Sequence, residues 1–256
     1  FVYFHNQITT LIKMSFYYKK MRKNYAVIAA GGLGTRLKDY DGNLHTKVLI
    51  DIDGLSMISS QINQLKKWGF IDFIVITNPE FHDLIVRDIN TNFKNINISF
   101  VTQIAPKGIA DALSYAESEV EEGSLVTFIL GDNFFGSNPL LGVNYDNFQG
   151  AKIFAVNVEN PEEFGVMELN SQKKVIDLHE KPDTFISSFA IVGLYIYDKS
   201  CFELIKKLKP SSRGELEITD LNKLYLSQNL LSYNVIDSWW IDAGTEERIN
   251  ELKNLI

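Results

Sequence analysis

Short apolar runs and helical stripes alternate along the chain from Tyr25 onward. Residues 25–30 form a continuous apolar run that ends at glycines, as a strand buried on both faces does. Residues 56–68 carry apolar side chains at helical spacing, and Gly69 follows as a helix-ending residue. The alternation continues through strands predicted at 73–77, 98–101 and 125–130 and helices predicted at 81–89 and 110–120. This order predicts a mostly parallel sheet with helices on both faces, in which the most apolar strand, 125–130, lies centrally.

The second half of the chain is richer in strands. Strands are predicted at 151–158, 166–169, 175–179 and 190–197, with turn residues between them. The remaining predicted elements are helices near 201–208 and 218–227, a strand pair at 231–235 and 239–242, and a terminal helix from Glu246. No linker rich in Pro, Gly or Ser divides the sequence. We therefore expect one α/β domain over residues 25–256 with a β-rich insertion.

The composition is that of a globular protein of this size. Of the 256 residues, 45% are hydrophobic and 22% are charged. The net charge of −7 and the lack of a long basic stripe disfavour nucleic-acid binding, which needs clustered Lys and Arg. No apolar run approaches the ~20 residues that span a membrane. Because Cys201 is the single cysteine, no internal disulfide forms, and we expect a reducing, cytoplasmic setting.

Residues 1–24 differ from the rest of the chain in charge. They hold five basic side chains and no acidic one. A secretory signal would place its charge before an apolar core and would end in small residues, and this segment does neither. We interpret it as an N-terminal extension outside the domain, with a basic amphipathic membrane anchor as the alternative.

The sharpest local signal follows the first predicted strand. Three glycines within residues 31–34 precede Thr35 and Arg36. Glycines let a backbone approach a phosphate closely and turn several N–H groups toward it. The spacing is not that of a dinucleotide loop, which would need a glycine at Leu37, nor that of a Walker loop, which would need Gly-Lys-Ser/Thr. The segment therefore predicts a phosphate site of another kind.

Two carboxylates follow apolar strands that lie far apart in the sequence. Asp132 comes after the strand at 125–130, and Asp242 ends the strand at 239–242. In open α/β sheets ligands bind beyond the carboxyl ends of the strands, so both carboxylates are expected there. Mg²⁺ takes one or two protein carboxylates and completes its shell with phosphate and water oxygens. The four histidines are too dispersed along the chain to indicate a zinc site.

Residues 29–37 resemble the signature loop of the sugar nucleotidylyltransferases, which join a nucleoside triphosphate to a sugar 1-phosphate and release pyrophosphate. The resemblance implies that Arg36 grips the triphosphate and that Lys47 is a second catalytic cation. It also implies that Asp132 and Asp242 hold Mg²⁺. The loop residues expected to contact the nucleotide are Ala30, Gly31, Gly32, Gly34 and Thr35.

Two further segments resemble the same family. In 103–112, Gln103 and the backbone at Gly108 are expected to contact the base, and a Gln amide offers both donors and an acceptor. In the segment Glu180-Lys181-Pro182, Lys181 is expected to hold the sugar phosphate as a third catalytic cation, and Glu180 the sugar hydroxyls.

The segment 213–220 is similar to the matching part of bacterial glucose-1-phosphate thymidylyltransferases. In that resemblance Arg213 adds a second contact to the sugar phosphate. Two further strands are expected to line the sugar pocket through Gly165 and Val192. The resemblance implies an α/β, Rossmann-like mixed sheet of the nucleotide-diphospho-sugar transferase type, in which the β-rich insertion binds the sugar.

The implied substrates are a nucleoside triphosphate and a sugar 1-phosphate, with dTTP and glucose 1-phosphate as the leading pair and Mg²⁺ as the cofactor. Some positions depart from the family pattern: Val48 stands where a glutamine is expected, and Lys107 and Asp111 stand where the thymidylyl-type loop has Asp and Gln. The choice of nucleoside triphosphate therefore stays open among dTTP, UTP, CTP and GTP. Two further hypotheses stay open as well: choline phosphate in place of the sugar phosphate, and a non-catalytic binding module on this fold. Assembly into a homo-oligomer is also left open.

Overall fold

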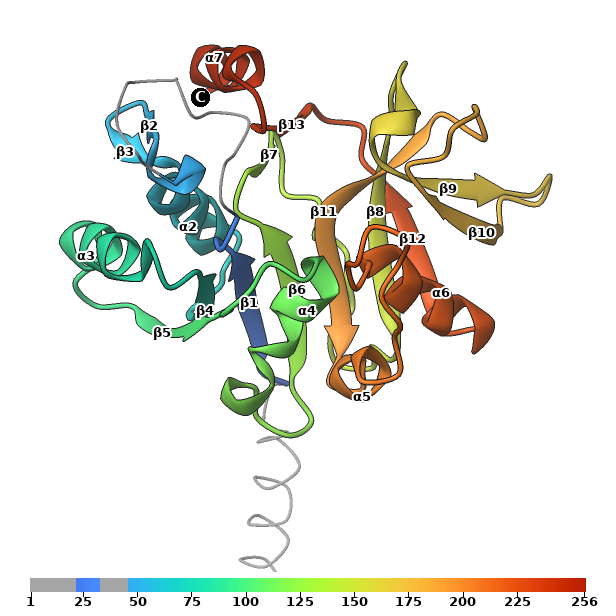
Figure 1. Ribbon diagram of the computed structural model, residues 1–256, viewed down its shortest axis with the longest axis horizontal. Helices are drawn as coiled ribbons and strands as arrows, with labels where there is room; N and C mark the ends of the chain where they lie inside the picture. Colours follow the sequence, from blue (N-terminus) through green and yellow to red (C-terminus); the bar gives the residue numbers. More distant parts are fainter. Residues whose placement is uncertain (1–21, 33–45) are drawn as a thin grey trace, which may run out of the picture.

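The computed structural model describes residues 22–32 and 46–256 and builds them around one mixed sheet of nine strands. Four parallel strands form its first half, in the spatial order β5 (Asn97–Thr102), β4 (Asp72–Thr77), β1 (Asn24–Ala29) and β6 (Leu125–Leu130). β6 lies in the middle of the sheet, between β1 and β11 (Phe189–Asp198), as the sequence predicted (Figure 1). Its apolar run is buried because neighbours cover both faces and both edges.

The second half of the sheet is mostly antiparallel. β11 runs antiparallel to β6, to β8 (Ala151–Asn157) and to β9 (Gly165–Leu169). β10 (Val175–Glu180) pairs with β9, and this hairpin projects at the right-hand end of Figure 1. The predicted α/β fold, a mixed sheet with a β-rich addition, is confirmed.

The strands expected as a pair near the C-terminus belong to different sheets. β12 (Leu231–Val235) runs parallel to β8 at the edge of the main sheet. β13 (Trp240–Asp242) instead pairs with β7 (Asn133–Phe135) in a separate two-stranded ribbon. The interpretation of a local pair was therefore wrong, because each strand finds its partner far away in the sequence.

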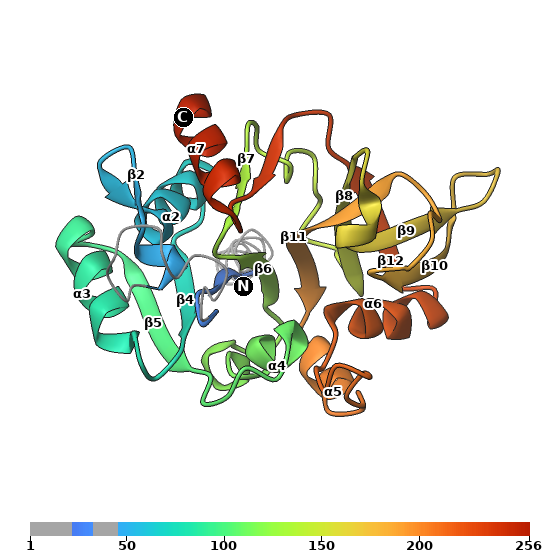
Figure 2. The same ribbon diagram turned by 45° about the horizontal axis from the view of Figure 1, so that its top comes forward.

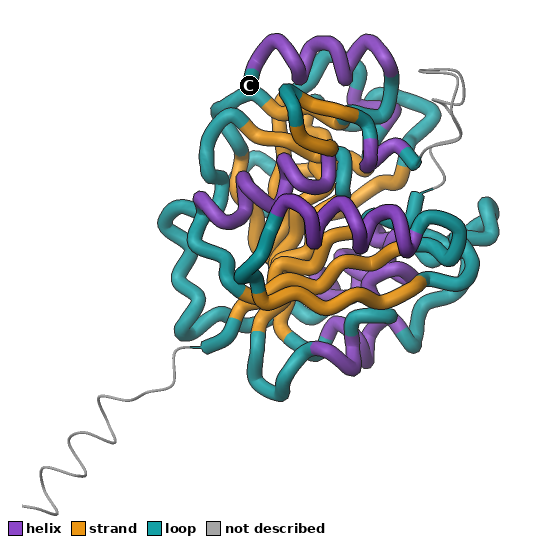
Figure 3. The backbone as a smooth tube through the Cα atoms, turned by 90° about the vertical axis from the view of Figure 1, so that its left-hand side faces the viewer, coloured by secondary structure: helices purple, strands orange, loops and turns teal. Residues whose placement is uncertain are grey.

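Helices cover both faces of the main sheet (Figure 3). α2 (Met57–Lys67) and α3 (His82–Asn92) pack on one face. On the other face lie α4 (Ile109–Ser114), α5 (Cys201–Ile205) and α6 (Ile218–Ser227), which follow one another in Figure 2. The C-terminal helix α7 (Glu246–Leu255) packs on a smaller core with β13 and with the short hairpin of β2 (Asp51–Ile52) and β3 (Leu55–Ser56).

The packed part of the chain begins slightly before Tyr25. The Arg22 Nε–H donates to the carbonyl oxygen of Gly123 at 2.7 Å, and Lys23 forms ion pairs with Glu121 at 3.0 Å and Asp72 at 3.4 Å. The rest of the predicted extension, residues 1–21, lies outside the described residues. Among the described helices, none combines the length and apolar character that crossing a membrane requires.

Candidate active site

Two cavities meet at the carboxyl ends of the parallel strands. The smaller, of about 280 Å³, is lined by six residues that the sequence singled out: Gly31, Gly32, Lys47, Gln103, Gly108 and Asp132. The larger, of about 640 Å³, is lined by four others from that set: Gly165, Glu180, Lys181 and Asp242. Ile109 and Leu130 line both cavities, so the two spaces share a wall.

The glycine segment leaves β1 with its carbonyl groups held by the protein. The Asn78 amide donates to the Gly31 carbonyl at 3.1 Å, and the Thr46 hydroxyl donates to the Gly32 carbonyl at 3.3 Å. These bonds engage oxygen atoms that would otherwise repel a phosphate. Ala30 is fully buried just before the turn. Gly34, Thr35 and Arg36 lie outside the described residues, so their predicted contacts stay predictions.

Gln103 and Gly108 form another part of the smaller cavity. Gln103 directly follows β5, and its backbone N–H donates to the Thr77 carbonyl at 2.8 Å. Gly108 has a φ of +106°, and a Cβ added there would lie 2.5 Å from the Leu216 carbonyl oxygen. Only glycine fits so close an approach in this backbone conformation. The segment that contains Gly108 is thereby fixed against the chain that leads into α6.

Lys47 and Asp132 form an ion pair in the wall of the smaller cavity. Burial alone would raise the pKa of the Asp132 carboxyl, but the charge and hydrogen bond of Lys47, together with Asn133, hold it below its usual value. The Asn133 amide donates to Asp132 Oδ1 at 2.8 Å. Its own oxygen accepts from the Gly193 N–H at 2.9 Å and from Trp240 Nε1 at 2.7 Å. Asn133 therefore ties the Asp132 carboxylate to β11 and β13.

The β7–β13 ribbon brings the second predicted aspartate beside the first. Asp242 pairs with Asn133 in register, and the Ala243 N–H donates to the Asp132 carbonyl at 2.8 Å. Arg248 of α7 lies 3.9 Å from the Asp242 carboxylate and 3.3 Å from that of Glu163. The structure thus places the backbones of the two aspartates side by side at one end of the sheet, and their joint role as metal ligands stays a prediction.

The donor set fits a hard cation such as Mg²⁺. Carboxylate oxygens are the ligands it prefers, and a substrate phosphate and water supply the remainder of its shell. Within residues 22–32 and 46–256 no cluster of three or more His, Cys, Asp or Glu side chains has the geometry of a metal site. Asp132 lines the smaller cavity and Asp242 the larger, so the two carboxylates are the residues available to a cation where the cavities meet.

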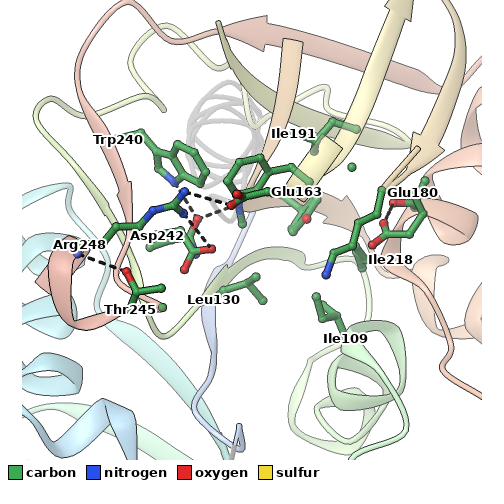
Figure 4. Close-up of a pocket in the computed structure, with 18 of the residues that line it drawn as sticks. Ile109, Leu130, Glu163, Glu180, Ile191, Ile218, Trp240, Asp242, Thr245 and Arg248 are labelled. Carbon is green, nitrogen blue, oxygen red and sulfur yellow. Dashed lines mark hydrogen bonds and ion pairs between the residues drawn. The ribbon is translucent and has the colours of Figure 1, made fainter. Parts of the chain in front are cut away.

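The larger cavity has carboxylates on opposite sides (Figure 4). Asp242 and Arg248 lie on one side of it and Glu180 on the other, with Leu130 and Ile109 between them. The Trp240 ring also lines it and packs edge-on against Phe164, with ring centroids 5.2 Å apart. A cavity of mixed lining, with charged side chains placed around apolar ones, is typical of a small-molecule site.

Glu180 is held in place by a network from α6 and the segment before it. Its Oε2 accepts from the Thr219 hydroxyl at 2.5 Å, and its Oε1 accepts from Arg213 Nη2 at 3.2 Å. Glu217 accepts two further bonds from the same guanidinium, and Glu215 lies 3.9 Å from it. These carboxylates raise the pKa of Arg213 through hydrogen bonding and charge.

Of the other residues predicted on the sugar side, only some line the larger cavity. Lys181 follows β10 with a φ of +42°, an uncommon conformation for a residue other than glycine, and it lines the larger cavity. Gly165 lines the same cavity from β9. Val192 of β11 is fully buried in the core, whereas Ile191 and Gly193 on either side of it line the cavity. The phosphate contact expected of Arg213 stays a prediction, because its bonds to Glu180 and Glu217 direct the guanidinium to carboxylates.

Several residues that shape the site had no individual role predicted from the sequence, although Glu217, Thr219 and Tyr195 lie in segments that resemble the family. Asn133 directly follows Asp132, so its place beside a strand-end aspartate was the available signal. Glu217 and Thr219 stand at the start of α6, where a polar residue has an ordinary explanation in helix capping. Tyr195 lines the larger cavity and stacks on Phe128, and its pKa is raised by burial and by the Glu180 charge.

Comparison with known proteins agrees with this geometry. The Nucleotidyl transferase family model matches residues 25–256. A glucose-1-phosphate thymidylyltransferase of Neisseria meningitidis is 36% identical over 236 residues, which cover 90% of this chain and 81% of that protein. One of Mycobacterium tuberculosis is 35% identical over 239 residues, with the same two coverages.

Solved structures add a likeness of fold. A Bacillus anthracis protein, described as a candidate glucose-1-phosphate thymidylyltransferase and crystallised with sucrose, has a TM-score of 0.82 at 35% identity and covers 91% of this chain and 94% of its own. A UDP-glucose pyrophosphorylase in complex with UDP-glucose shares the fold, with a TM-score of 0.77 at 20% identity over 91% of this chain and 98% of its own. The chain therefore belongs to the nucleotidyl transferase family, and it is an enzyme of the class that joins a nucleoside triphosphate to a sugar 1-phosphate.

Proposed function

We propose that the enzyme transfers a thymidylyl group from dTTP to glucose 1-phosphate, giving dTDP-glucose and pyrophosphate. The observation that carries this proposal is the meeting of two cavities at Ile109 and Leu130. The smaller cavity, the proposed nucleotide cavity, is lined by Gly31, Gly32 and Gln103. The larger cavity is lined by Glu180 and Lys181, which suit a sugar phosphate. The named relatives at 35–36% identity support the choice of base and sugar.

The reaction needs no nucleophile from the protein. An oxygen of the sugar phosphate forms a bond to the α-phosphorus while the bond from that phosphorus to the bridging oxygen of pyrophosphate breaks. The protein positions two anionic reactants and offsets their repulsion. Lys181 holds the sugar phosphate, Glu180 accepts hydrogen bonds from sugar hydroxyls, and Arg213 keeps Glu180 in place. Each donor aimed at developing charge typically contributes ~3 kcal/mol.

The triphosphate is held from the opposite side. The N–H groups of the glycine turn and the Arg36 guanidinium stabilise the pyrophosphate as it leaves. Lys47 keeps the Asp132 carboxylate ionised and adds positive charge to the wall of the nucleotide cavity. Asp132 and Asp242 are the residues that would hold Mg²⁺. The bound metal supplies positive charge that lowers the cost of bringing the two phosphates together.

The partners of the enzyme are thus a nucleoside triphosphate and a sugar 1-phosphate, and the cytoplasmic setting expected from its cysteine content belongs to the same proposal. UTP, CTP or GTP would use the same chemistry. A catalytically silent module is disfavoured, since Arg36 and both aspartates are present in the chain.

Pyrophosphate release tests the proposal directly. The purified chain is assayed with Mg²⁺ across a panel of four triphosphates and several phospho-substrates, including glucose 1-phosphate, its galactose and mannose counterparts and choline phosphate. We expect the highest kcat/KM for dTTP with glucose 1-phosphate. The Asp132→Asn variant serves as the background, and no combination above that background means that the proposed activity is wrong. A higher kcat/KM for another pair would replace the proposed substrates.

A further inference from the structure

Gln103 has both hydrogens of its amide group engaged by the protein. The side chain is buried, with 7% of its surface exposed. Its Nε2 donates to Asp111 Oδ2 at 2.8 Å and, more weakly, to the Gly108 carbonyl at 3.4 Å. Asp111 comes from the first turn of α4, and Gly108 directly precedes that helix. Two acceptors from one short segment, the Asp111 carboxylate and the Gly108 carbonyl, therefore determine how the amide is turned.

The chemistry of these partners permits only this orientation. A carboxylate and a main-chain carbonyl can only accept hydrogen bonds. A flipped amide would place Oε1 against two acceptors and would lose both bonds. Gln103 Oε1 therefore points the other way, toward Gly31. A Cβ added to Gly31 would lie 3.5 Å from that oxygen, and Gly31 and Gln103 both line the nucleotide cavity.

A glutamine held in this way offers the nucleobase an acceptor and no donor. An unrestrained glutamine amide can turn either end to a ligand. Thymine and uracil carry an N–H at ring position 3, which can donate to Gln103 Oε1. Cytosine has a lone pair at the same position, so the two acceptors would repel each other. The two kinds of pyrimidine are thereby distinguished at one atom.

We propose that Asp111 is a positioning residue that sets base specificity: it fixes Gln103 with its carbonyl oxygen toward the base and so favours pyrimidines with an N3–H over cytosine. The proposal rests on the proposed function, because it assigns the base at the same nucleotide cavity. A second role is open to Asp111, since an acidic residue in a first helical turn also stabilises the helix. Helix stabilisation would affect the turnover of every nucleotide to the same extent. A change in the ratio between two bases therefore distinguishes the positioning role of Asp111 from its role in the helix.

The test compares dUTP with dCTP, which differ only at positions 3 and 4 of the ring. The kcat/KM for each is measured with saturating glucose 1-phosphate, in the wild type and in Asp111→Asn. Asn has nearly the same shape but can donate as well as accept, so the Gln103 amide can turn over. We expect the ratio of dUTP to dCTP to fall roughly 10- to 100-fold, the range for one buried polar atom that loses its partner. The matched control is Asp83→Asn in the first turn of α3, which should leave the ratio unchanged.

An unchanged ratio of dUTP to dCTP in Asp111→Asn would overturn the proposal. If the kcat/KM values for both nucleotides fall equally, Asp111 is assigned to helix stability alone. Gln103→Ala provides an independent arm: it should remove the preference, and adding Asp111→Asn should change the ratio no further. If the wild type turns over neither of these nucleotides nor dTTP, the proposed function fails instead. Calorimetric titration of dUTP and dCTP into the same proteins then decides the role of Asp111 from the binding ratio.

Discussion

Glu217 holds the Arg213 guanidinium through two hydrogen bonds, 3.2 Å from Nε to Oε1 and 2.8 Å from Nη2 to Oε2. The Glu217 side chain is 7% exposed, whereas that of Arg213 is 40% exposed. A two-point contact with a buried carboxylate fixes the plane of the guanidinium as well as its position. Because Arg213 also binds Glu180, which lines the larger cavity, the order of that cavity depends on a residue outside it.

Glu217→Gln should therefore weaken the binding of the sugar phosphate. The amide keeps the size of the carboxylate but loses one acceptor and the charge, so Arg213 and Glu180 lose their fixed arrangement. We expect KM for glucose 1-phosphate to rise about 10-fold, the cost of one charge-assisted hydrogen bond, with KM for dTTP nearly unchanged. The control is Glu203→Gln, which breaks an exposed pair with Lys206 on α5 and should alter neither KM. An equal rise in both KM values would indicate a general loss of structure.

The place of Asp132 was predictable from the sequence, whereas the contacts of its neighbour Asn133 were not. The strands were predictable because buried parallel strands are short and continuously apolar, and both strand-end aspartates follow from that pattern. The contacts of Asn133 were not, because Gly193 and Trp240 lie 60 and 107 residues away along the chain. Hydrogen bonds over such separations are set by the packing of strands and leave no periodic trace in the sequence.

Helix length shows a second limit. Residues 110–120 were expected to form one helix, yet α4 ends at Ser114 and a 3-10 turn, Glu117–Glu119, follows. Ala116 and Val120 are still buried in the core, so the apolar spacing was correct. The spacing alone cannot tell an α-helix from a helix that ends and continues as a tighter turn.

Lys181 and Arg36 should act on different substrates. Lys181 lines the larger cavity, the proposed site of the sugar phosphate, so Lys181→Ala should raise KM for glucose 1-phosphate about 10- to 100-fold through the loss of a charged contact. Arg36→Ala should instead lower kcat, because the planar guanidinium matches phosphate oxygens whose charge grows during the reaction. Titration of dTTP into Lys181→Ala distinguishes the two sites. A large loss of dTTP affinity in that variant would contradict the placement of Lys181 on the sugar side.

The ion pair of Lys47 and Asp132 predicts a shift in the pH dependence of activity. The pKa of Asp132 is held low, so this carboxylate contributes stability above its unfolded pKa of about 3.9 and loses it as the pH falls through the lower folded value. In Lys47→Met the burial remains without the offsetting charge, so the pKa should rise. We expect the acidic limb of kcat/KM to move to higher pH, with Lys206→Met as an exposed control. An unmoved limb in Lys47→Met would mean that Asp132 does not govern it.

Two deletions test how far the domain extends toward the N-terminus. Removal of residues 1–20 should leave the melting temperature and activity unchanged, because the contacts described at this end begin at Arg22. Removal of residues 1–23 also takes away Arg22 and Lys23, which bind Gly123, Glu121 and Asp72. That deletion should lower the melting temperature by several degrees, as a loss of about 1–2 kcal/mol does in a chain of this size. Thermal melts of both proteins provide the measurement, and an inactive or insoluble 1–20 deletion would show that this segment packs on the core.

Asp132 and Asp242 should behave as one unit. They are 110 residues apart in the sequence. The Ala243 N–H donates to the Asp132 carbonyl, so the two chain segments lie side by side at the site. If both carboxylates hold the same Mg²⁺, the loss of either should remove most of the metal-dependent rate, and the loss of both should cost little more. Asn keeps the shape of the side chain and removes its charge, so Asp132→Asn, Asp242→Asn and the double variant form the cycle.

The measurement is kcat/KM at saturating Mg²⁺ for all four proteins, with the melting temperature as a check on folding. Groups that act together are strongly non-additive, whereas independent ones add to within about 0.5 kcal/mol. Losses that sum would separate the two residues. Asp242 would then be assigned to its contact with Arg248, 3.9 Å away at the edge of the larger cavity, and Asp132 to the smaller cavity.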